Sequence, residues 1–147
     1  MSISEMNLKQ RSLLFAKFAA IAYGKEEVVR EEVKQYNFTD VTFYDHDGAQ
    51  AFRFESEADV VIACRGTQPT EFNDLKADLK AFPVMAETVS RVHRGFKAEV
   101  DELWPDVRQG TQTLKKLWFC GHSLGAAMAT IMAARCMDDI TLTDPVQ

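Results

Sequence analysis

The chain has 147 residues, 46% hydrophobic and 27% charged, a composition typical of a folded globular protein rather than a disordered one. This length is enough for a single domain with a substantial core. The formal net charge is −5, and the basic residues are scattered among acidic ones, which argues against a nucleic-acid partner.

The N-terminus lacks a basic region followed by an apolar core, so the sequence predicts no signal peptide. The longest early apolar stretch, residues 13–23, is interrupted by Lys17 and is too short to span a bilayer. The sequence contains three cysteines, Cys64, Cys120 and Cys136. An odd number without a close pair argues against a disulfide framework or a metal site, and it suits a reducing compartment. The location stays open, with the cytoplasm favoured.

Two helices are predicted at the N-terminus. Ser2 and Glu5 fit a capping box that would begin the first helix. Gly24 would close it, and one face carries the apolar residues Leu14, Phe18, Ile21 and Ala22. We expect this face to pack in the core; binding to a membrane surface is the alternative. The charge-rich segment 26–35 predicts a second, shorter helix.

A β-hairpin and a buried strand follow. Segments 41–44 and 51–54 flank Asp47-Gly48, a pair typical of a tight hairpin turn. His46 lies at this turn between two acids, and we favour a solvated turn residue over a metal ligand there. The continuous apolar run 60–64 predicts a strand that is buried on both faces.

The second half of the chain alternates polar segments with predicted helices and one strand. The elements expected in chain order are a polar segment with apolar anchors at 70–80, an extended segment at 82–85, a helical stretch from 92 to about 114 in which Pro105 starts a new turn, a buried strand at 117–120, a helix at 123–137 that ends at Asp138-Asp139, and a loop at 140–147.

The motif Gly121-His122-Ser123-Leu124-Gly125 lies between this last strand and helix, where a nucleophile elbow is expected. Such an elbow places its serine on a sharp, strained turn. Side chains at 121 and 125 would collide there, and glycine removes the collision. The Leu124 N–H would lie at a helix N-terminus, where it can stabilise an oxyanion. The structural alternative is a serine N-cap between two closely packed glycines.

Two cysteines precede the elbow in the sequence. Cys64 and Cys120 lie in apolar strands, where a free cysteine usually behaves as a small hydrophobic residue. A catalytic cysteine is the alternative, which we disfavour because Ser123 already occupies the elbow.

Three further segments accompany the elbow: 65–67 (Arg-Gly-Thr), 74–79 (Asp-Leu-Lys-Ala-Asp-Leu) and 92–96 (Val-His-Arg-Gly-Phe). In this order the four segments resemble the class 3 lipases, the fungal triacylglycerol lipase-like branch of the α/β-hydrolases. The resemblance runs from about residue 60 to 135, and it implies the α/β-hydrolase fold in a single domain.

The resemblance implies roles for the matched positions. Ser123 would be the acyl-forming nucleophile. Thr67 would supply oxyanion contacts through its backbone N–H and hydroxyl, and the Leu124 N–H would supply another. His93 matches a structural position near the pocket, and His122 is the variable elbow residue, whose side chain leaves the turn away from Ser123.

Two other features concern the pocket. Segment 80–91 corresponds to the region that covers the pocket in the family. Leu75 stands where the family usually has tryptophan, and we expect this departure to alter packing rather than chemistry.

The main departure from the family lies after the elbow. In these hydrolases the triad acid and base follow the nucleophile, but no histidine follows His122, and the acids that do follow lack a base: Asp138, Asp139 and Asp144. We therefore expect an α/β-hydrolase fold that is incomplete after the elbow helix, the N-terminal part of a longer lipase. Strand 116–120 would then keep one neighbour and expose its other edge, and we expect edge-to-edge self-association.

These features predict a serine carboxylic ester hydrolase that acts on acylglycerols or simpler esters through an acyl-enzyme, with interfacial lipid contact and with no metal or organic cofactor. Without a base its activity would fall by several orders of magnitude. One alternative is a catalytically dead lipase-like remnant that binds a lipid or a protein. Another is a thioesterase or peptidase, which would share the elbow but not the segments at 65–67 and 92–96.

Overall fold

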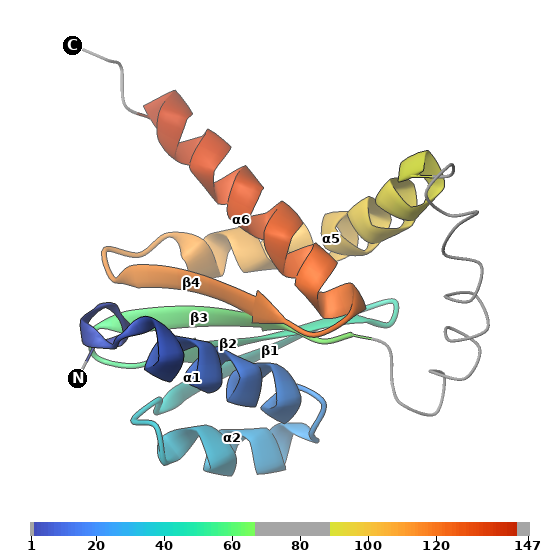
Figure 1. Cartoon of the computed structure of the whole chain (residues 1–147). Coiled ribbons are helices and arrows are strands. Elements are labelled where there is room, and N and C mark those ends of the chain that lie inside the picture. The colour runs from blue at the N-terminus through green and yellow to red at the C-terminus, as the bar shows by residue number, and fades with distance from the viewer. Residues whose placement is uncertain (1, 67–88, 144–147) are drawn as a thin grey trace.

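The computed structural model describes residues 2–66 and 89–143, with side chains described for 2–66 and 98–137. The predicted segments at 70–80 and 82–85 therefore lie outside the described residues. The described elements, in chain order, are η1 (Ile3–Glu5), α1 (Leu8–Ile21), α2 (Glu26–Lys34), β1 (Asp40–His46), β2 (Ala49–Glu55), β3 (Asp59–Cys64), α5 (Val89–Thr111), β4 (Lys116–Gly121) and α6 (Leu124–Thr143) (Figure 1). The chain is thus a mixed α/β protein.

The described strands form one sheet in the order β1-β2-β3-β4. β1, β2 and β3 pair in antiparallel fashion, and β4 pairs with β3 in parallel. The β3–β4 register places Val60 opposite Leu117 and Cys64 opposite Gly121. The two apolar runs predicted as strands, 60–64 and 117–120, are therefore adjacent and parallel in one sheet.

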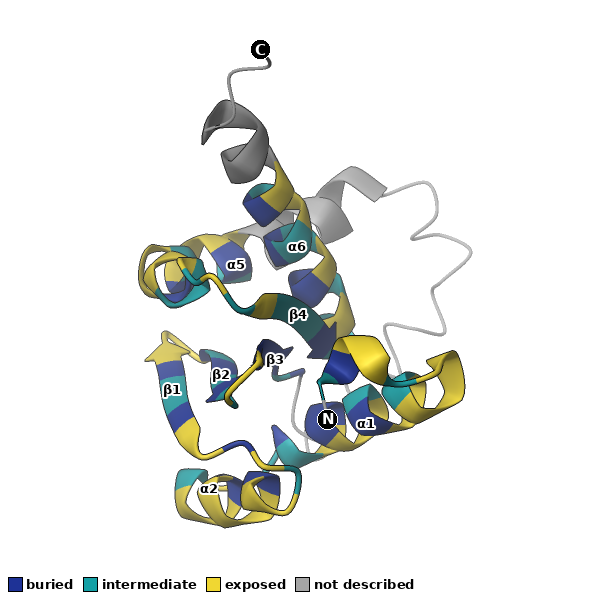
Figure 2. Cartoon of the chain, turned by 90° about the vertical axis from the view of Figure 1, so that its left-hand side faces the viewer, coloured by how far each residue is buried: buried dark blue, intermediate teal, exposed yellow. Residues whose placement is uncertain are grey.

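Helices cover both faces of this sheet. α1 packs below β3 and β4, and α2 packs against β1, while α5 lies over β1 and β2 and α6 over β3 and β4 (Figure 2). The first helix therefore packs in the core as expected. The part of the chain that the structure describes contains no helix long and apolar enough to cross a membrane.

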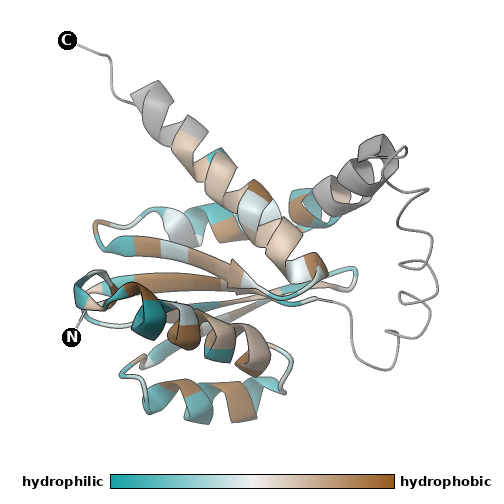
Figure 3. Cartoon of the chain, in the orientation of Figure 1, coloured by the Kyte–Doolittle hydropathy of each residue, from teal (hydrophilic) through white to brown (hydrophobic). Residues whose placement is uncertain are grey.

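Two apolar clusters fill the spaces between the layers, and the side-chain alternation of the strands explains both. The cluster under the sheet contains Phe18, Phe52 and Phe54, and the cluster above it contains Ile62 and Met132. All six residues of β3 are buried, which confirms a strand covered on both faces. In Figure 3, β3 accordingly carries the apolar colours along most of its length.

The N-terminal capping box is present, but it caps a different element from the one predicted. Ser2 and Glu5 cap the short η1, and α1 begins only at Leu8, after a second capping box that Asn7 makes with Gln10. The predicted single helix was therefore wrong at its start, because a second capping sequence follows the first within five residues.

The β-hairpin is confirmed, with a two-residue turn at Asp47 and Gly48 whose φ angles are 50° and 88°. Positive φ at both positions is typical of the type I′ turn that Asp-Gly favours. His46 is exposed, but it is the last residue of β1 rather than part of the turn, and its Nε2 lies 2.6 Å from Asp106 Oδ2 on α5.

Both C-terminal helices differ from the prediction: α5 begins and ends about three residues earlier than predicted, and α6 is longer. α5 continues through Pro105, which therefore starts no new turn. The helix tolerates a proline in its interior, a cost of about 3 kcal/mol, because Leu103 and Val107 on either side are buried against the sheet. α6 continues past Asp138-Asp139 to Thr143, so their assignment as the helix end was wrong. Aspartate lowers helix propensity only modestly, and the next helix breaker is Pro145.

β4 lies at the edge of the sheet that the described strands form, as predicted. It is less buried than expected: Leu117, Trp118 and Phe119 are only half-buried, and Cys120 is buried. A strand with one neighbour loses the cover that a second neighbour provides. The edge-to-edge association that this arrangement suggests stays a prediction.

A buried carboxylate lies at the opposite end of the sheet from the elbow. Asp59 is 2% exposed and accepts hydrogen bonds from the Ile3 backbone N–H at 2.9 Å and from Trp118 Nε1 at 2.9 Å. A longer contact joins it to Ser2 Oγ at 3.3 Å. Asp59 therefore ties η1 and β4 to the start of β3, and the sequence analysis did not identify it.

Candidate functional site at the elbow

The elbow connects β4 to α6 through only two residues, His122 and Ser123. Ser123 has a φ of 57°, in the left-handed region that residues other than glycine rarely adopt. The turn is closed by hydrogen bonds from the Gly125 and Ala126 N–H groups to the carbonyls of His122 and Ser123, both 3.0 Å long. Ser123 is thus a half-buried residue on a sharp turn at the carboxyl end of β4.

The two glycines of the motif are required by close backbone contacts. A Cβ on Gly121 would lie 2.2 Å from the carbonyl oxygen of Gly125, and a Cβ on Gly125 would lie 2.3 Å from the carbonyl oxygen of Cys64. Backbone atoms cannot yield as a flexible side chain can. The predicted collision is therefore confirmed, and the second glycine also lets α6 approach the end of β3.

Leu124 is the first residue of α6, which starts where the β4 arrow ends (Figure 1). The N–H groups at a helix N-terminus carry partial positive charge and lack partners within the helix. None of the hydrogen bonds among the described residues uses the Leu124 N–H. This geometry can offer a hydrogen bond to an anionic oxygen held beside Ser123.

The other predicted oxyanion residue, Thr67, lies outside the described residues, as do Leu75 and segment 80–88. The described chain stops one residue earlier, at the buried Gly66. The backbone nitrogen of Gly66 would lie 3.0 Å from a Cβ on Gly125, so the chain leaves β3 directly beside the elbow. His93 belongs to α5, where its side chain is not described.

The other two histidines make contacts of their own. His122 is exposed, and its Nδ1 lies 3.1 Å from the hydroxyl of Tyr23, at the end of α1. His46, at the end of β1, pairs with Asp106 of α5. β1 lies three strand positions from β4, so roughly 14 Å separates the two strands at the usual strand spacing. His46 and the elbow therefore lie at the same end of the sheet but well beyond hydrogen-bond reach of each other.

Tyr23 is the residue of this region that sequence reasoning missed. It belongs to the apolar stretch 13–23, where periodicity predicts packing and gives no sign that a hydroxyl reaches the elbow. Only the tertiary arrangement brings the end of α1 to residue 122, 99 positions further along the chain.

The cysteines near the site are unsuited to nucleophilic chemistry. Cys64 and Cys120 are buried, and burial raises the pKa of both thiols, that of Cys120 to about 12. A thiolate is the reactive form, so a raised pKa suppresses reactivity. The interpretation of both residues as small hydrophobic core residues agrees with this. Within the described ranges 2–66 and 89–143, no cluster of side chains has the composition of a metal site.

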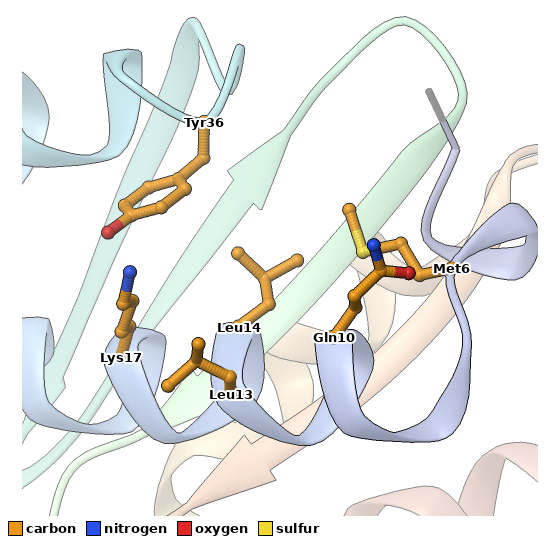
Figure 4. A pocket seen from close by; sticks show the side chains of 6 residues that line it. All are labelled: Met6, Gln10, Leu13, Leu14, Lys17 and Tyr36. Atoms are coloured by element: carbon orange, nitrogen blue, oxygen red, sulfur yellow. The ribbon is translucent and has the colours of Figure 1, made fainter.

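Two hollows line α1. The larger, about 610 Å³, lies between α1 and the end of β4 and is mostly apolar; its lining is Phe15, Ala16, Ala19, Ala20, Tyr23, Cys120, Gly121 and His122. The smaller, about 200 Å³, is lined by Met6, Gln10, Leu13, Leu14, Lys17 and Tyr36 (Figure 4). Of these two, the larger reaches the elbow, at Gly121 and His122.

The family comparison agrees with this geometry. The family described as Lipase (class 3) matches residues 61–142, which is more than half of the chain and includes most of β3, all of β4, the elbow and nearly all of α6. Comparison with curated proteins and with solved structures gives no match. From the family match, the chain belongs to the class 3 lipases, a family of lipase-like hydrolases.

Proposed function

We propose that this chain is a serine carboxylic ester hydrolase with an α/β-hydrolase fold, which acts through an acyl-enzyme at Ser123. The observation that carries the proposal is the left-handed Ser123, with φ 57°, between a parallel strand and a helix N-terminus in a class 3 lipase. That conformation is costly for a residue other than glycine, and such strain is concentrated at functional sites.

In the proposed reaction the Ser123 hydroxyl oxygen attacks the ester carbonyl and gives up its proton, and the carbonyl oxygen becomes an oxyanion. The Leu124 N–H and Thr67 stabilise that oxyanion. The C–O bond to the alcohol then breaks, the alcohol leaves with a proton, and Ser123 keeps the acyl group. Water hydrolyses the acyl-enzyme in the same manner and restores the hydroxyl.

The proton that leaves Ser123 needs an acceptor. The sequence contains three histidines, at positions 46, 93 and 122, and none follows the nucleophile. His46 is too distant, and His122 is hydrogen-bonded to Tyr23. We therefore propose that the isolated chain acylates slowly, and that His93 or a histidine of a second chain is the first candidate if acylation is fast.

Acylglycerols and simpler esters are the proposed substrates, by descent from the lipase family. Apart from water, this ester chemistry uses only side-chain and backbone groups of the protein. The apolar hollow of about 610 Å³ beside the elbow supports an apolar ligand rather than a charged one.

The alternative is a lipase-like protein that has lost catalysis and binds a lipid. The same apolar hollow supports it, together with the engagement of His122 by Tyr23, which occupies the histidine adjacent in sequence to the nucleophile. In that case Ser123 would be an inherited structural residue.

Hydrolysis of p-nitrophenyl butyrate and p-nitrophenyl palmitate by the wild-type chain and by Ser123→Ala distinguishes the two functions. The hydrolase predicts p-nitrophenol release that Ser123→Ala abolishes. A wild-type rate equal to that of Ser123→Ala, with saturable binding of palmitate to both proteins, would favour the binding function.

A further inference from the structure

We propose that Tyr23 is a positioning residue for the elbow, whose hydroxyl joins the ring of His122 to the backbone of Gly66 and so holds the carboxyl ends of β3 and β4 at a fixed separation. The inference rests on the proposed function in one respect, because the geometry that Tyr23 would hold is that of the Ser123 site.

The anchor of this contact is the end of α1. Tyr23 follows the last turn of the helix, where its N–H bonds to the Ala20 carbonyl at 3.2 Å and the Gly24 N–H bonds to the Ile21 carbonyl at 2.9 Å. The neighbouring Ala22 is fully buried. Because α1 packs along β3 and β4, the Tyr23 ring is attached to the helical layer that covers these strands (Figure 1, Figure 2).

The first contact of the hydroxyl is with the elbow. Tyr23 Oη lies 3.1 Å from His122 Nδ1, and the two rings meet edge to face with centroids 6.1 Å apart. His122 is otherwise exposed. Tyr23 is thus a side chain of another element that holds the residue immediately before Ser123.

The second contact is with the end of β3. A Cβ on Gly66 would lie 2.6 Å from the Tyr23 hydroxyl oxygen and 2.6 Å from the His122 carbonyl oxygen, so three segments meet at this point. Burial raises the pKa of the Tyr23 hydroxyl, while the charge of Arg65 and a hydrogen bond from the Gly66 backbone lower it. The Tyr23 hydroxyl oxygen therefore lies against the Gly66 backbone on one side and against His122 Nδ1 on the other.

The consequence for the site follows from the turn itself. The His122 carbonyl accepts the hydrogen bond of the Gly125 N–H, so a displacement of His122 moves the first turn of α6. Oxyanion donors are effective only within a few tenths of an ångström of their best distance. A hydroxyl that fixes His122 against Gly66 therefore fixes the Leu124 N–H relative to the chain that leaves β3.

Tyr23→Phe removes this hydroxyl and keeps the ring, and Tyr36→Phe is the matched control on a second half-buried tyrosine that packs against α1. Amide hydrogen exchange reports the positioning directly. We expect Tyr23→Phe to speed exchange at Gly66 by about fivefold, the loss of one hydrogen bond, with exchange in the interior of β3 unchanged. Tyr36→Phe should change neither.

Reaction of Ser123 with a fluorophosphonate reports the effect on the site. We expect Tyr23→Phe to lower the limiting rate constant about fivefold and to leave the half-saturating concentration unchanged, because the residue acts on the geometry of the reaction rather than on reagent binding. A general loss of stability would instead speed exchange throughout the sheet.

His122→Leu removes the other partner of the bond at an exposed position, so it keeps the test valid if Tyr23→Phe does not fold. If His122 acts through its bond to Tyr23, the double variant should lose no more than Tyr23→Phe alone. Unchanged Gly66 exchange in Tyr23→Phe, or fully additive losses in the double variant, would overturn the inference. If wild type and Ser123→Ala react alike, the proposed function fails, while Gly66 exchange still decides the role of Tyr23.

Discussion

Replacement of Asp59 by alanine tests the packing that supports the sheet. The carboxylate is 2% exposed and accepts two short hydrogen bonds, one from the Ile3 backbone N–H and one from Trp118 Nε1, both at 2.9 Å. Hydrogen bonds to a charged group contribute about 1.5–3 kcal/mol each. Removal of a buried charge offsets part of that loss. We expect Asp59→Ala to lower the free energy of unfolding by about 3 kcal/mol.

Two further variants sharpen this prediction. Asp59→Asn keeps one acceptor oxygen but turns an amide NH₂ towards one of the two donors, so it should lose about half as much as Asp59→Ala. Glu57→Ala removes an exposed acid from the same turn and should change stability by less than about 0.5 kcal/mol.

Urea unfolding followed by far-UV circular dichroism measures these differences, because tryptophan fluorescence would respond to the loss of the Trp118 contact itself. The midpoint should fall while the slope stays constant. If Asp59→Ala is as stable as Glu57→Ala, then the carboxylate does not hold η1 and β4 to β3, and our account of this end of the sheet is wrong.

Three other predictions concern the elbow, the thiols and pH. Gly121→Ala places a Cβ 2.2 Å from the carbonyl oxygen of the second elbow glycine, so it should cost more than about 2 kcal/mol in urea unfolding; a neutral substitution would contradict the backbone contact. The buried thiols of Cys64 and Cys120, whose pKa values are raised, should react with Ellman's reagent at pH 8 only after unfolding; rapid reaction of the native chain would count against their burial. A hydrogen bond from Lys115 lowers the pKa of Glu55 below its ordinary value of 4.5, so this carboxylate stabilises the fold above that pH and the stabilisation is lost as pH falls through the lowered pKa. Glu55→Gln should flatten the acid limb of the stability curve, and an unchanged limb would refute this assignment.

The parts of the fold that local sequence determines were predictable. The apolar run of β3, the Asp-Gly turn and the strand-to-helix context of the elbow each express a rule of backbone geometry or burial. The two glycines of the elbow belong to the same class, because the collision that they avoid is between near neighbours in the motif.

Features that depend on distant segments were not predictable from local patterns. Asp59 is an ordinary polar residue in the sequence, and its burial depends on donors 56 and 59 positions away. The contact of Tyr23 with His122 spans 99 positions. Two predicted helix boundaries were wrong for a related reason. Packing on the sheet stabilises α5 through Pro105, and α6 continues past Asp138-Asp139 because aspartate does not break a helix.

Reaction of the whole chain with a fluorophosphonate, followed by digestion and mass spectrometry, tests the central claim most directly. Ser12, an exposed serine on α1, serves as an internal reference for a hydroxyl without a site. We predict an adduct at Ser123 that forms slowly, because no base has been placed beside it, yet clearly faster than at Ser12, with no comparable adduct in Ser123→Ala. Equal labelling of the two serines would contradict the claim that the elbow activates Ser123.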